Sequence, residues 1–179
     1  MTPSQRDGKQ GLCYRCSRHD DQPGDGSTSV IDGITSVELR VRYAETDQMG
    51  VAYHTHYLVW CEVARTDHMR QLGVSYRSLE DGGLRLAVVD ARIRYGAPAR
   101  YDDLVRVRCW VRDLGSRRIV FGYAIGRPAD AAHLAIAQTA LIALDRSHTV
   151  TRLPPAALGK LSVAPDPVRG YSSIPGPAY

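Results

Sequence analysis

The sequence has almost no lysine and no long apolar run. Lys9 and Lys160 are the only lysines among 23 basic residues, and the arginines are spread along segments that also carry acids. A nucleic-acid-binding protein more typically concentrates its basic residues in one stripe. No stretch has the roughly 20 consecutive apolar residues that cross a bilayer, and none has the character of a secretory signal. These absences predict a soluble, cytoplasmic protein with no integral membrane segment and no nucleic-acid partner.

Cysteine is also scarce, and the sequence pattern of one large hydrolase class is missing. Cys13 and Cys16 form a single CxxC, followed by His19. One CxxC without a second ligand pair is weak evidence for zinc, so we predict no metal site and no cofactor. We expect Cys61 and Cys109 to be core thiols rather than a disulfide pair. The GxSxG turn typical of serine hydrolases does not occur in the chain.

The chain has 179 residues, of which 44% are hydrophobic, and a net charge of +4. This length and composition fit one folded domain with loose ends. Residues 1–34 are rich in Gly, Ser, Asp, Gln and Arg, which predicts a disordered N-terminal extension. We expect the folded domain over residues 35–153, followed by a C-terminal tail over residues 154–179 with a short helix at Ala156 to Leu161.

Five segments show the residue pattern of β-strands. In Val37 to Tyr43, apolar and charged residues alternate with the period of a half-buried strand. The other four segments are Leu84 to Ala97, Leu104 to Leu114, Arg118 to Gly126 and His133 to Leu144. The last of these is apolar on both faces, as a central or interface strand is. Together with one helix after the first strand, they predict an α+β domain in which an antiparallel sheet of about five strands wraps around one long helix.

A loop and a helix follow the first predicted strand. Residues 45–50, ETDQMG, favour an irregular turn that presents Asp47. Helical periodicity begins near Thr55 or His56, and Gly73 is well placed to end the helix. We expect Tyr57, Trp60, Val63 and Ala64 on the apolar face, and Arg65, Arg70 and Gln71 on the outer face.

A carboxylate beside the start of a helix has a chemical use. The unpaired N–H groups of the first helical turn, together with the helix dipole, can stabilise an oxygen that becomes negative during a reaction. Asp47 can then act as a nucleophile on an acyl carbon or as a base for water. The alternative for Asp47 is a purely structural turn residue. His54 and His56 can equally cap the helix, fill a polar notch or face solvent.

Two blocks of the sequence resemble one enzyme family. The blocks are RYAETDQMGVAYHTHYLVWCEVAR, from Arg42 to Arg65, and DARIRYGAPARYDDLVRVRCWV, from Asp90 to Val111. They resemble the hotdog-fold thioesterases of the 4-hydroxybenzoyl-CoA thioesterase type, including the bacterial Tol–Pal-associated acyl-CoA thioesterases. The resemblance covers about residues 36–152 and implies a hotdog fold. It also implies that Asp47 is the catalytic carboxylate and that the backbone N–H of His54 polarises the substrate carbonyl.

The family usually has Asn where this chain has His56, which affects a role of that side chain but not a role of the backbone. The resemblance places the substrate between the subunits of a homodimer or homotetramer, which also covers the edges of a single sheet. It implies CoA phosphate contacts at Ser116, Arg117 and Arg118, where arginine can bind phosphate through two donors. Further candidate substrate-binding residues are Tyr53, His56, Tyr57 and Glu62.

Glu62 has two expected environments. It faces the acyl pocket or the partner subunit, or else it pairs with Arg65 one helical turn later. The reaction that the resemblance implies is hydrolysis of an acyl-CoA thioester to a free carboxylic acid and CoA. A thiolate leaves readily, so positioning, carbonyl polarisation and one carboxylate suffice. Two alternatives stay open: a hotdog-fold hydroxyacyl-thioester dehydratase that uses His54 with Asp47, and a non-catalytic acyl-CoA-binding module.

Overall fold

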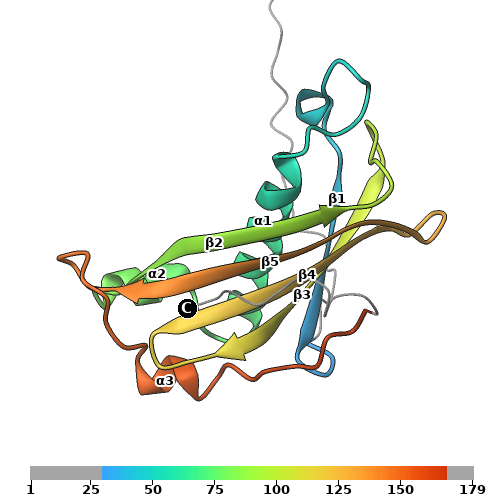
Figure 1. The fold of residues 1–179 in the computed structure, drawn as a ribbon. Coiled ribbons are helices and arrows are strands. Elements are labelled where there is room, and N and C mark those ends of the chain that lie inside the picture. Colours follow the sequence, from blue (N-terminus) through green and yellow to red (C-terminus); the bar gives the residue numbers. More distant parts are fainter. Residues whose placement is uncertain (1–29, 169–179) are drawn as a thin grey trace, which may run out of the picture.

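The computed structural model of the protein describes residues 30–168, so Cys13, Cys16 and most of the predicted N-terminal extension lie outside the described residues. The elements follow in the order β1 (Ile34–Arg40), the 3-10 helix η1 (Tyr43–Glu45), α1 (His56–Gln71), α2 (Tyr76–Asp81), β2 (Arg85–Tyr95), β3 (Leu104–Leu114), β4 (Arg118–Arg127), β5 (Ala132–Leu144) and α3 (Pro155–Leu158). Figure 1 shows one sheet, with α1 along one of its faces.

The strands form one antiparallel sheet in the order β1-β3-β4-β5-β2. β5 therefore lies inside the sheet between β4 and β2, and residues 134–141 are all buried. This confirms the prediction of a central strand, because a strand covered on both faces needs apolar side chains on both. β1 and β2 form the two edges of the sheet.

β1 differs from the predicted strand at Val37 to Tyr43. It begins three residues earlier, and it pairs with β3 from Ile34 opposite Trp110 to Arg40 opposite Leu104. Beyond Arg40 there is no further strand partner, because β3 itself begins at Leu104. The apolar alternation continues to residue 43, but strand pairing decides where β1 ends. The prediction was therefore wrong at both ends of this strand.

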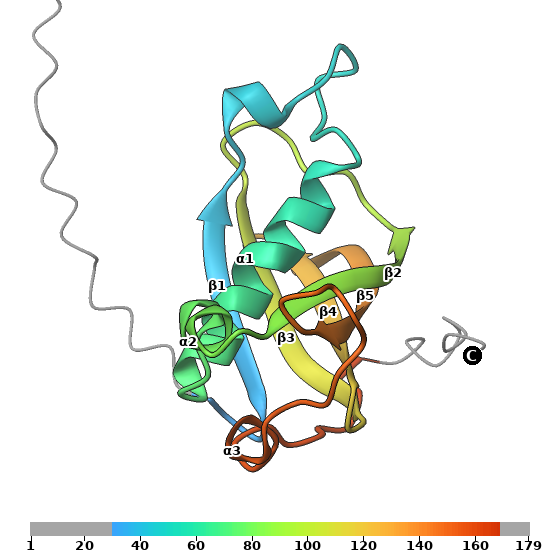
Figure 2. The ribbon, with the colours of Figure 1, turned by 90° about the vertical axis from the view of Figure 1, so that its left-hand side faces the viewer.

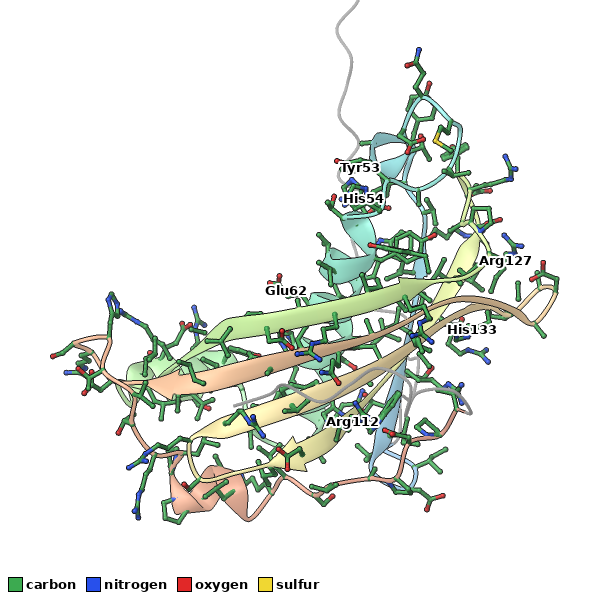
Figure 3. The ribbon with its side chains drawn as sticks, in the orientation of Figure 1. Tyr53, His54, Glu62, Arg112, Arg127 and His133 are labelled. Carbon is green, nitrogen blue, oxygen red and sulfur yellow. The ribbon has the colours of Figure 1, made fainter. Side chains whose placement is uncertain are left out.

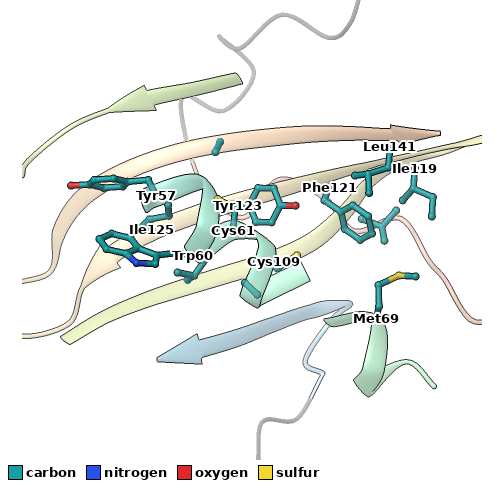
Figure 4. Close-up of a cluster of buried hydrophobic side chains, with 14 of the residues drawn as sticks. Tyr57, Trp60, Cys61, Met69, Cys109, Ile119, Phe121, Tyr123, Ile125 and Leu141 are labelled. Atoms are coloured by element: carbon teal, nitrogen blue, oxygen red, sulfur yellow. The ribbon is translucent and has the colours of Figure 1, made fainter. Parts of the chain in front are cut away.

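One core fills the space between α1 and the sheet. α1 packs mainly on β1 and β3 (Figure 2), and the other strands continue the sheet past the helix. Figure 4 shows buried side chains from both layers, including Trp60, Cys61 and Met69 of the helix and Cys109 and Phe121 of the strands. Cys61 and Cys109 are buried free thiols, as predicted, and burial raises the pKa of each. The predicted α+β architecture, an antiparallel sheet around one long helix, is confirmed.

The two faces of α1 differ from prediction at two positions. Arg65 was expected outside but is only 7% exposed, whereas Val63 was expected in the core and is 45% exposed. Arg65 follows the buried residue Ala64 on the helix, and its guanidinium carbon is 5.9 Å from the centre of the Tyr76 ring on α2. The short helix α2 thus covers the Arg65 side chain. Gly73, at φ +71°, ends the helix as predicted.

The chain after α3 returns to the outer face of the sheet, opposite α1. The Ala164 N–H donates to the Val111 carbonyl at 2.9 Å. The Asp166 carboxylate accepts from Trp110 Nε1 at 3.2 Å and lies 3.3 Å from Arg112 Nε. Part of the expected C-terminal tail therefore packs on the sheet. None of the helices within residues 30–168 combines the length and apolar character needed to cross a membrane.

Candidate active site

Asp47 lies in a tight turn between η1 and α1. Its Oδ1 accepts a hydrogen bond from the Met49 N–H at 2.8 Å, and its carbonyl accepts from the Gly50 N–H at 2.9 Å. The Asp47 N–H donates to the Val51 carbonyl at 2.9 Å, and Gly50 has φ +72°, which suits glycine. Within residues 30–168 no hydrogen bond reaches Asp47 Oδ2. The turn fixes the half-buried carboxylate and leaves one oxygen available.

A buried carboxylate, Glu45, ties this turn to α1. Glu45 is 3% exposed, and its two oxygens accept from the Arg42 backbone N–H at 2.8 Å, Arg42 Nη2 at 2.9 Å and Trp60 Nε1 at 3.2 Å. Burial alone raises the pKa of Glu45, but the hydrogen bonds from Arg42 and Trp60 outweigh it and hold the pKa below its usual value. Glu45 is not recognisable as a site residue from the sequence, because nothing local shows that Trp60 is its partner.

Backbone hydrogen bonds complete the attachment of the loop. The Ala52 N–H donates to the Ala99 carbonyl at 2.8 Å, and the Tyr53 N–H donates to the Glu45 carbonyl at 2.8 Å. The turn is therefore held both by the segment between β2 and β3 and by its own N-terminal end. A carboxylate on this turn has a defined position relative to the start of α1.

The N-terminus of α1 carries no side-chain cap. Thr55 occupies the N-cap position with helical backbone angles and makes no capping hydrogen bond through its side chain. The His56 N–H donates to the Tyr53 carbonyl at 3.0 Å, whereas the His54 N–H makes no hydrogen bond within residues 30–168. A free N–H at the positive end of the helix dipole can bind an oxygen acceptor. The geometry fits the predicted use of the His54 backbone.

Aromatic side chains surround this helix start. The Tyr95 hydroxyl of β2 donates to the His54 carbonyl at 2.8 Å, and the Ala99 N–H donates to the Tyr57 hydroxyl oxygen at 3.1 Å. The Tyr57 and Tyr95 rings meet edge to face with centres 5.2 Å apart. Burial raises the pKa of both tyrosines, which keeps both hydroxyls protonated. Tyr95 orients the residue with the free N–H, and strand periodicity alone did not reveal this role.

Most of the predicted site residues gather at this end of α1. The rings of Tyr53 and His54 lie 4.3 Å apart, and His56 lies 6.4 Å from Tyr53. Figure 3 shows Tyr53 and His54 together at the start of the helix and Glu62 farther along it. Glu62 is exposed, and no ion pair within residues 30–168 joins it to Arg65. Of the two environments expected for Glu62, the pair with Arg65 is therefore not made in the single chain.

The remaining predicted residues lie at the other end of the sheet. Ser116 and Arg117 lie in the turn between β3 and β4, and Arg118 is the first residue of β4, where its Nη2 donates to Asp113 at 2.7 Å. Tyr95 of β2, which contacts His54, pairs with Ala135 of β5, and Ala135 pairs in turn with Ile125 of β4. Arg118, near the other end of β4, pairs with Ile142 of β5. Positions 118 and 125 of β4 are seven residues apart, about 23 Å along a strand. One chain therefore keeps these two groups of residues well apart.

An additional arginine lies next to the β3–β4 turn. The Leu153 N–H donates to the Ser116 carbonyl at 2.8 Å, which places Arg152 beside this turn. Arg117 and Arg152 are both exposed. Arg152 is not predictable from the sequence, because 36 residues separate it from Ser116 and only the fold joins them. Three arginines thus come from two segments at one end of the sheet.

The structure shows no arrangement of metal ligands in the part of the chain that it describes. Residues 30–168 contain no group of three or more His, Cys, Asp or Glu side chains able to hold a metal ion. Cys13, Cys16 and His19 of the predicted N-terminal extension lie outside this range.

The chain is similar in sequence and in fold to known thioesterases. The chain is 44% identical over 96 residues to the putative acyl-CoA thioesterase YneP of Bacillus subtilis, a match that covers 54% of this chain and 70% of the relative. The DHNA-CoA thioesterase of Staphylococcus aureus superimposes with a TM-score of 0.65 at 35% identity, covering 67% of this chain and 80% of that one.

A more distant structure shows the same fold. A 4-hydroxybenzoyl-CoA thioesterase mutant in complex with 4-hydroxybenzoyl-CoA superimposes with a TM-score of 0.67 at 14% identity, covering 73% of this chain and 99% of that one. The predicted hotdog fold and the predicted resemblance are confirmed by these likenesses. The family model described as the thioesterase-like superfamily matches residues 41–161, more than half of the chain. The protein therefore belongs to the thioesterase-like superfamily, as an enzyme of the thioester-hydrolase type.

Proposed function

We propose that the protein hydrolyses acyl-CoA thioesters to a free carboxylic acid and CoA, with Asp47 as the reacting carboxylate. The observation that carries the proposal is the Asp47 turn, which Glu45 and Ala99 hold at the uncapped start of α1. The names of the relatives support the substrate class, since YneP is a putative acyl-CoA thioesterase and the staphylococcal neighbour acts on DHNA-CoA.

The mechanism begins with polarisation of the thioester carbonyl. The backbone N–H of His54 donates to the carbonyl oxygen, and the positive end of the α1 dipole stabilises the negative charge that develops there. The Tyr95 hydroxyl keeps the His54 peptide in place through its hydrogen bond to the His54 carbonyl. His54 thus contributes mainly through its backbone N–H, and Tyr53 contributes through packing against the His54 ring.

Asp47 then supplies the nucleophile in one of two ways. Its free Oδ2 attacks the carbonyl carbon, the C–S bond breaks, and water hydrolyses the resulting anhydride; alternatively, Asp47 takes a proton from water as the water attacks. In both cases the sulfur leaves as the CoA thiolate, which then takes up a proton. The Met49 N–H on Oδ1 keeps the carboxylate oriented in either route.

The exposed apolar surface of the single chain supports an assembly of two subunits. The β2 edge and the exposed side of α1 carry apolar side chains, with Val59 44%, Val63 45%, Val88 50% and Val89 43% exposed. Such a surface and a free strand edge favour an isologous dimer. In that dimer Asp47 of one subunit and Ser116, Arg117 and Arg118 of the other bind one CoA ester. Arg152 joins the phosphate-binding group, and Glu62, His56 and Tyr57 line the acyl end.

Thiol release from a panel of short, medium, long-chain and aromatic acyl-CoAs tests the proposal. We expect wild-type turnover of part of the panel and a loss of roughly a hundredfold or more in Asp47→Ala. Asp81→Ala, an exposed aspartate of α2, is the matched control and should retain full activity. An enzyme-only blank corrects for the cysteines.

Two outcomes contradict the proposal. Thiol release unaffected by Asp47→Ala removes this carboxylate from the mechanism. No thiol release from any ester points to another function. Loss of water from a hydroxyacyl-CoA would then indicate the dehydratase with His54 and Asp47, and binding without turnover would indicate an acyl-CoA-binding module.

A further inference from the structure

A hollow lies on the face of the sheet opposite α1. It has a volume of about 340 Å³ and is lined by Arg106 and Arg108 of β3, residues 124–127 of β4, and Pro128, Ala131, Ala132 and His133. Figure 3 shows Arg127 and His133 together near the β4–β5 turn. This volume is at the small end of the range for ligand sites in proteins.

The pattern of small and large residues across the strands explains the hollow. Arg106 pairs with Gly126 and Arg108 with Ala124, so each arginine stands beside a position with little or no side chain. Farther along β3, the space over the next glycine of β4 is filled, because the Trp110 ring lies over Gly122. Ala124 is itself only 3% exposed and packs with Trp110, Ile136 and Ala164, so the open part of the floor lies at Gly126. The floor of the hollow is therefore small and apolar, and its wall on β3 is cationic.

The arginines that line the hollow differ in their partners. Arg127 makes four hydrogen bonds, to Asp103, Asp130 and the Pro98 carbonyl, and these hold its guanidinium in place as one wall. Arg106 holds Glu38 through Nε at 2.9 Å and Nη2 at 2.6 Å, which leaves Nη1 free. Arg108 is half-buried and makes no ion pair or side-chain hydrogen bond within the described residues.

We propose that this hollow is a binding site for a small phosphate-bearing molecule, with Arg108 and Arg106 as the phosphate ligands. Alternate residues of a strand project from the same face about 7 Å apart, so two guanidinium groups can bracket one tetrahedral oxyanion and donate to separate oxygens. A planar carboxylate, in contrast, needs only one guanidinium group to bind both of its oxygens. A half-buried guanidinium without an anion is unfavourable, and a bound phosphate removes that cost.

The surrounding carboxylates limit what can bind. Glu38, Asp103 and Asp130 balance the charges of the three arginines, so the surface has no large positive field. Long polyanions such as nucleic acids depend on such a field. A compact ligand that relies on directed hydrogen bonds from Arg108 fits the site better. The site lies on the opposite face of the sheet from Asp47 and is independent of the proposed hydrolysis.

Amide chemical shifts of ¹⁵N-labelled protein, titrated with inorganic phosphate at constant ionic strength, test the proposal. We expect saturable shifts at the amides of Gly126 and His133. Arg108→Gln should weaken phosphate binding at these amides at least tenfold, and Arg108→Lys should weaken it less. Arg77→Gln, an exposed arginine of α2, is the matched control and should match the wild type. Shifts confined to residues 116–118 would show that phosphate binds near the turn between β3 and β4 and not in the hollow.

Three results would overturn the proposal. The first is the absence of saturable shifts at Gly126 and His133 in the wild type. The second is equal phosphate affinity in wild type and Arg108→Gln, provided that the thermal unfolding of the variant shows it to be folded. The third is tighter saturation of the same amides by acetate than by phosphate, since this would identify a carboxylate site instead.

Discussion

Single residues hold the candidate site in place, and Glu45 is the most important of those outside the reaction itself. Its carboxylate joins three donors from two parts of the chain, the Arg42 backbone and side chain and the Trp60 indole. Removal of one partner from a buried hydrogen-bonded group leaves the other groups unsatisfied. Glu45 therefore determines both local stability and the position of the Asp47 turn.

We predict that Glu45→Gln lowers the free energy of unfolding by about 1–3 kcal/mol, because a neutral amide replaces a charged acceptor and turns an NH₂ group toward other donors. Urea unfolding at pH 7 measures the loss. Glu38→Gln removes the exposed pair with Arg106 and is the control, with an expected change of about 0–1 kcal/mol. Equal effects of the two substitutions would show that Glu45 is not a structural anchor.

His68 is a second buried polar residue that affects stability. It is fully buried, its Nδ1 lies 3.1 Å from Thr35 Oγ1, and its Nε2 has no hydrogen-bond partner in the described part of the chain. Burial lowers the pKa of His68 to about 4, against a weaker opposite effect of Asp67. The pKa of histidine in the unfolded chain is about 6.5. At a pH below this value, the unfolded chain binds a proton at His68 that the folded protein does not bind.

The His68 contribution is therefore fully present above about pH 6.5 and is lost as the pH falls toward 4. Between pH 6.5 and 4.5 the expected loss is about 2 kcal/mol, because one pH unit is worth at most about 1.4 kcal/mol and the unfolded histidine is only half protonated at pH 6.5. Urea unfolding at several pH values measures it, and His68→Gln should remove this part of the pH dependence. An unchanged dependence in the variant would assign the loss to other groups.

At the scale of elements, strand pairing and packing correct what local patterns predict. Period-2 alternation located β3, β4 and β5 closely, because those strands lie inside the sheet and alternate or are buried along their length. The same alternation misplaced β1, whose ends depend on β3. Helical periodicity placed Tyr57 and Trp60 correctly but put Arg65 outside, because its burial depends on α2.

The contact between Trp110 and Gly122 shows how two neighbouring strands and the C-terminal segment fit together. A Cβ at Gly122 would lie 2.6 Å from the Trp110 ring, and Asp166 holds that ring through Nε1 at 3.2 Å. The ring therefore cannot shift without breaking its hydrogen bond. Glycine at this position on β4 allows the C-terminal segment to dock.

We predict that Gly122→Ala lowers the free energy of unfolding by about 1–3 kcal/mol through overpacking. Near-UV circular dichroism should change as the indole moves, and urea unfolding measures the loss. Gly115→Ala is a suitable control, because its Cβ would meet only the Arg118 carbonyl at 3.7 Å, an ordinary contact. A wild-type spectrum and stability in Gly122→Ala would mean that the sheet accommodates the methyl group.

At the scale of the whole molecule, the site residues divide into two groups. The sequence could predict both groups from the family resemblance, but it could not show that strand register separates them by about 23 Å within one chain. Arg152 and Tyr95 escaped prediction for the same reason, since each joins its group only through the fold. A second subunit supplies a simple way to unite the groups.

We predict that two inactive variants restore activity when they share a dimer. Asp47→Ala and the double variant Arg117→Ala with Arg118→Ala should each be strongly impaired, the second mainly through a raised KM for acyl-CoA. In the proposed dimer each site takes Asp47 and the arginines from different subunits, so a mixed dimer would contain one site with both defects and one intact site. Co-expression in equal amounts should recover about a quarter of wild-type activity at random pairing.

The recovered activity distinguishes the two possible origins of the arginines. If Asp47 and Arg117 act within one subunit, neither site of a mixed dimer is intact and no activity returns. Mixing Asp47→Ala with Asp47→Asn is the control, because it can give no intact site under either arrangement. Activity in the first mixture and none in the control would establish that a complete site needs two chains, since no single chain in either mixture carries an intact set of residues.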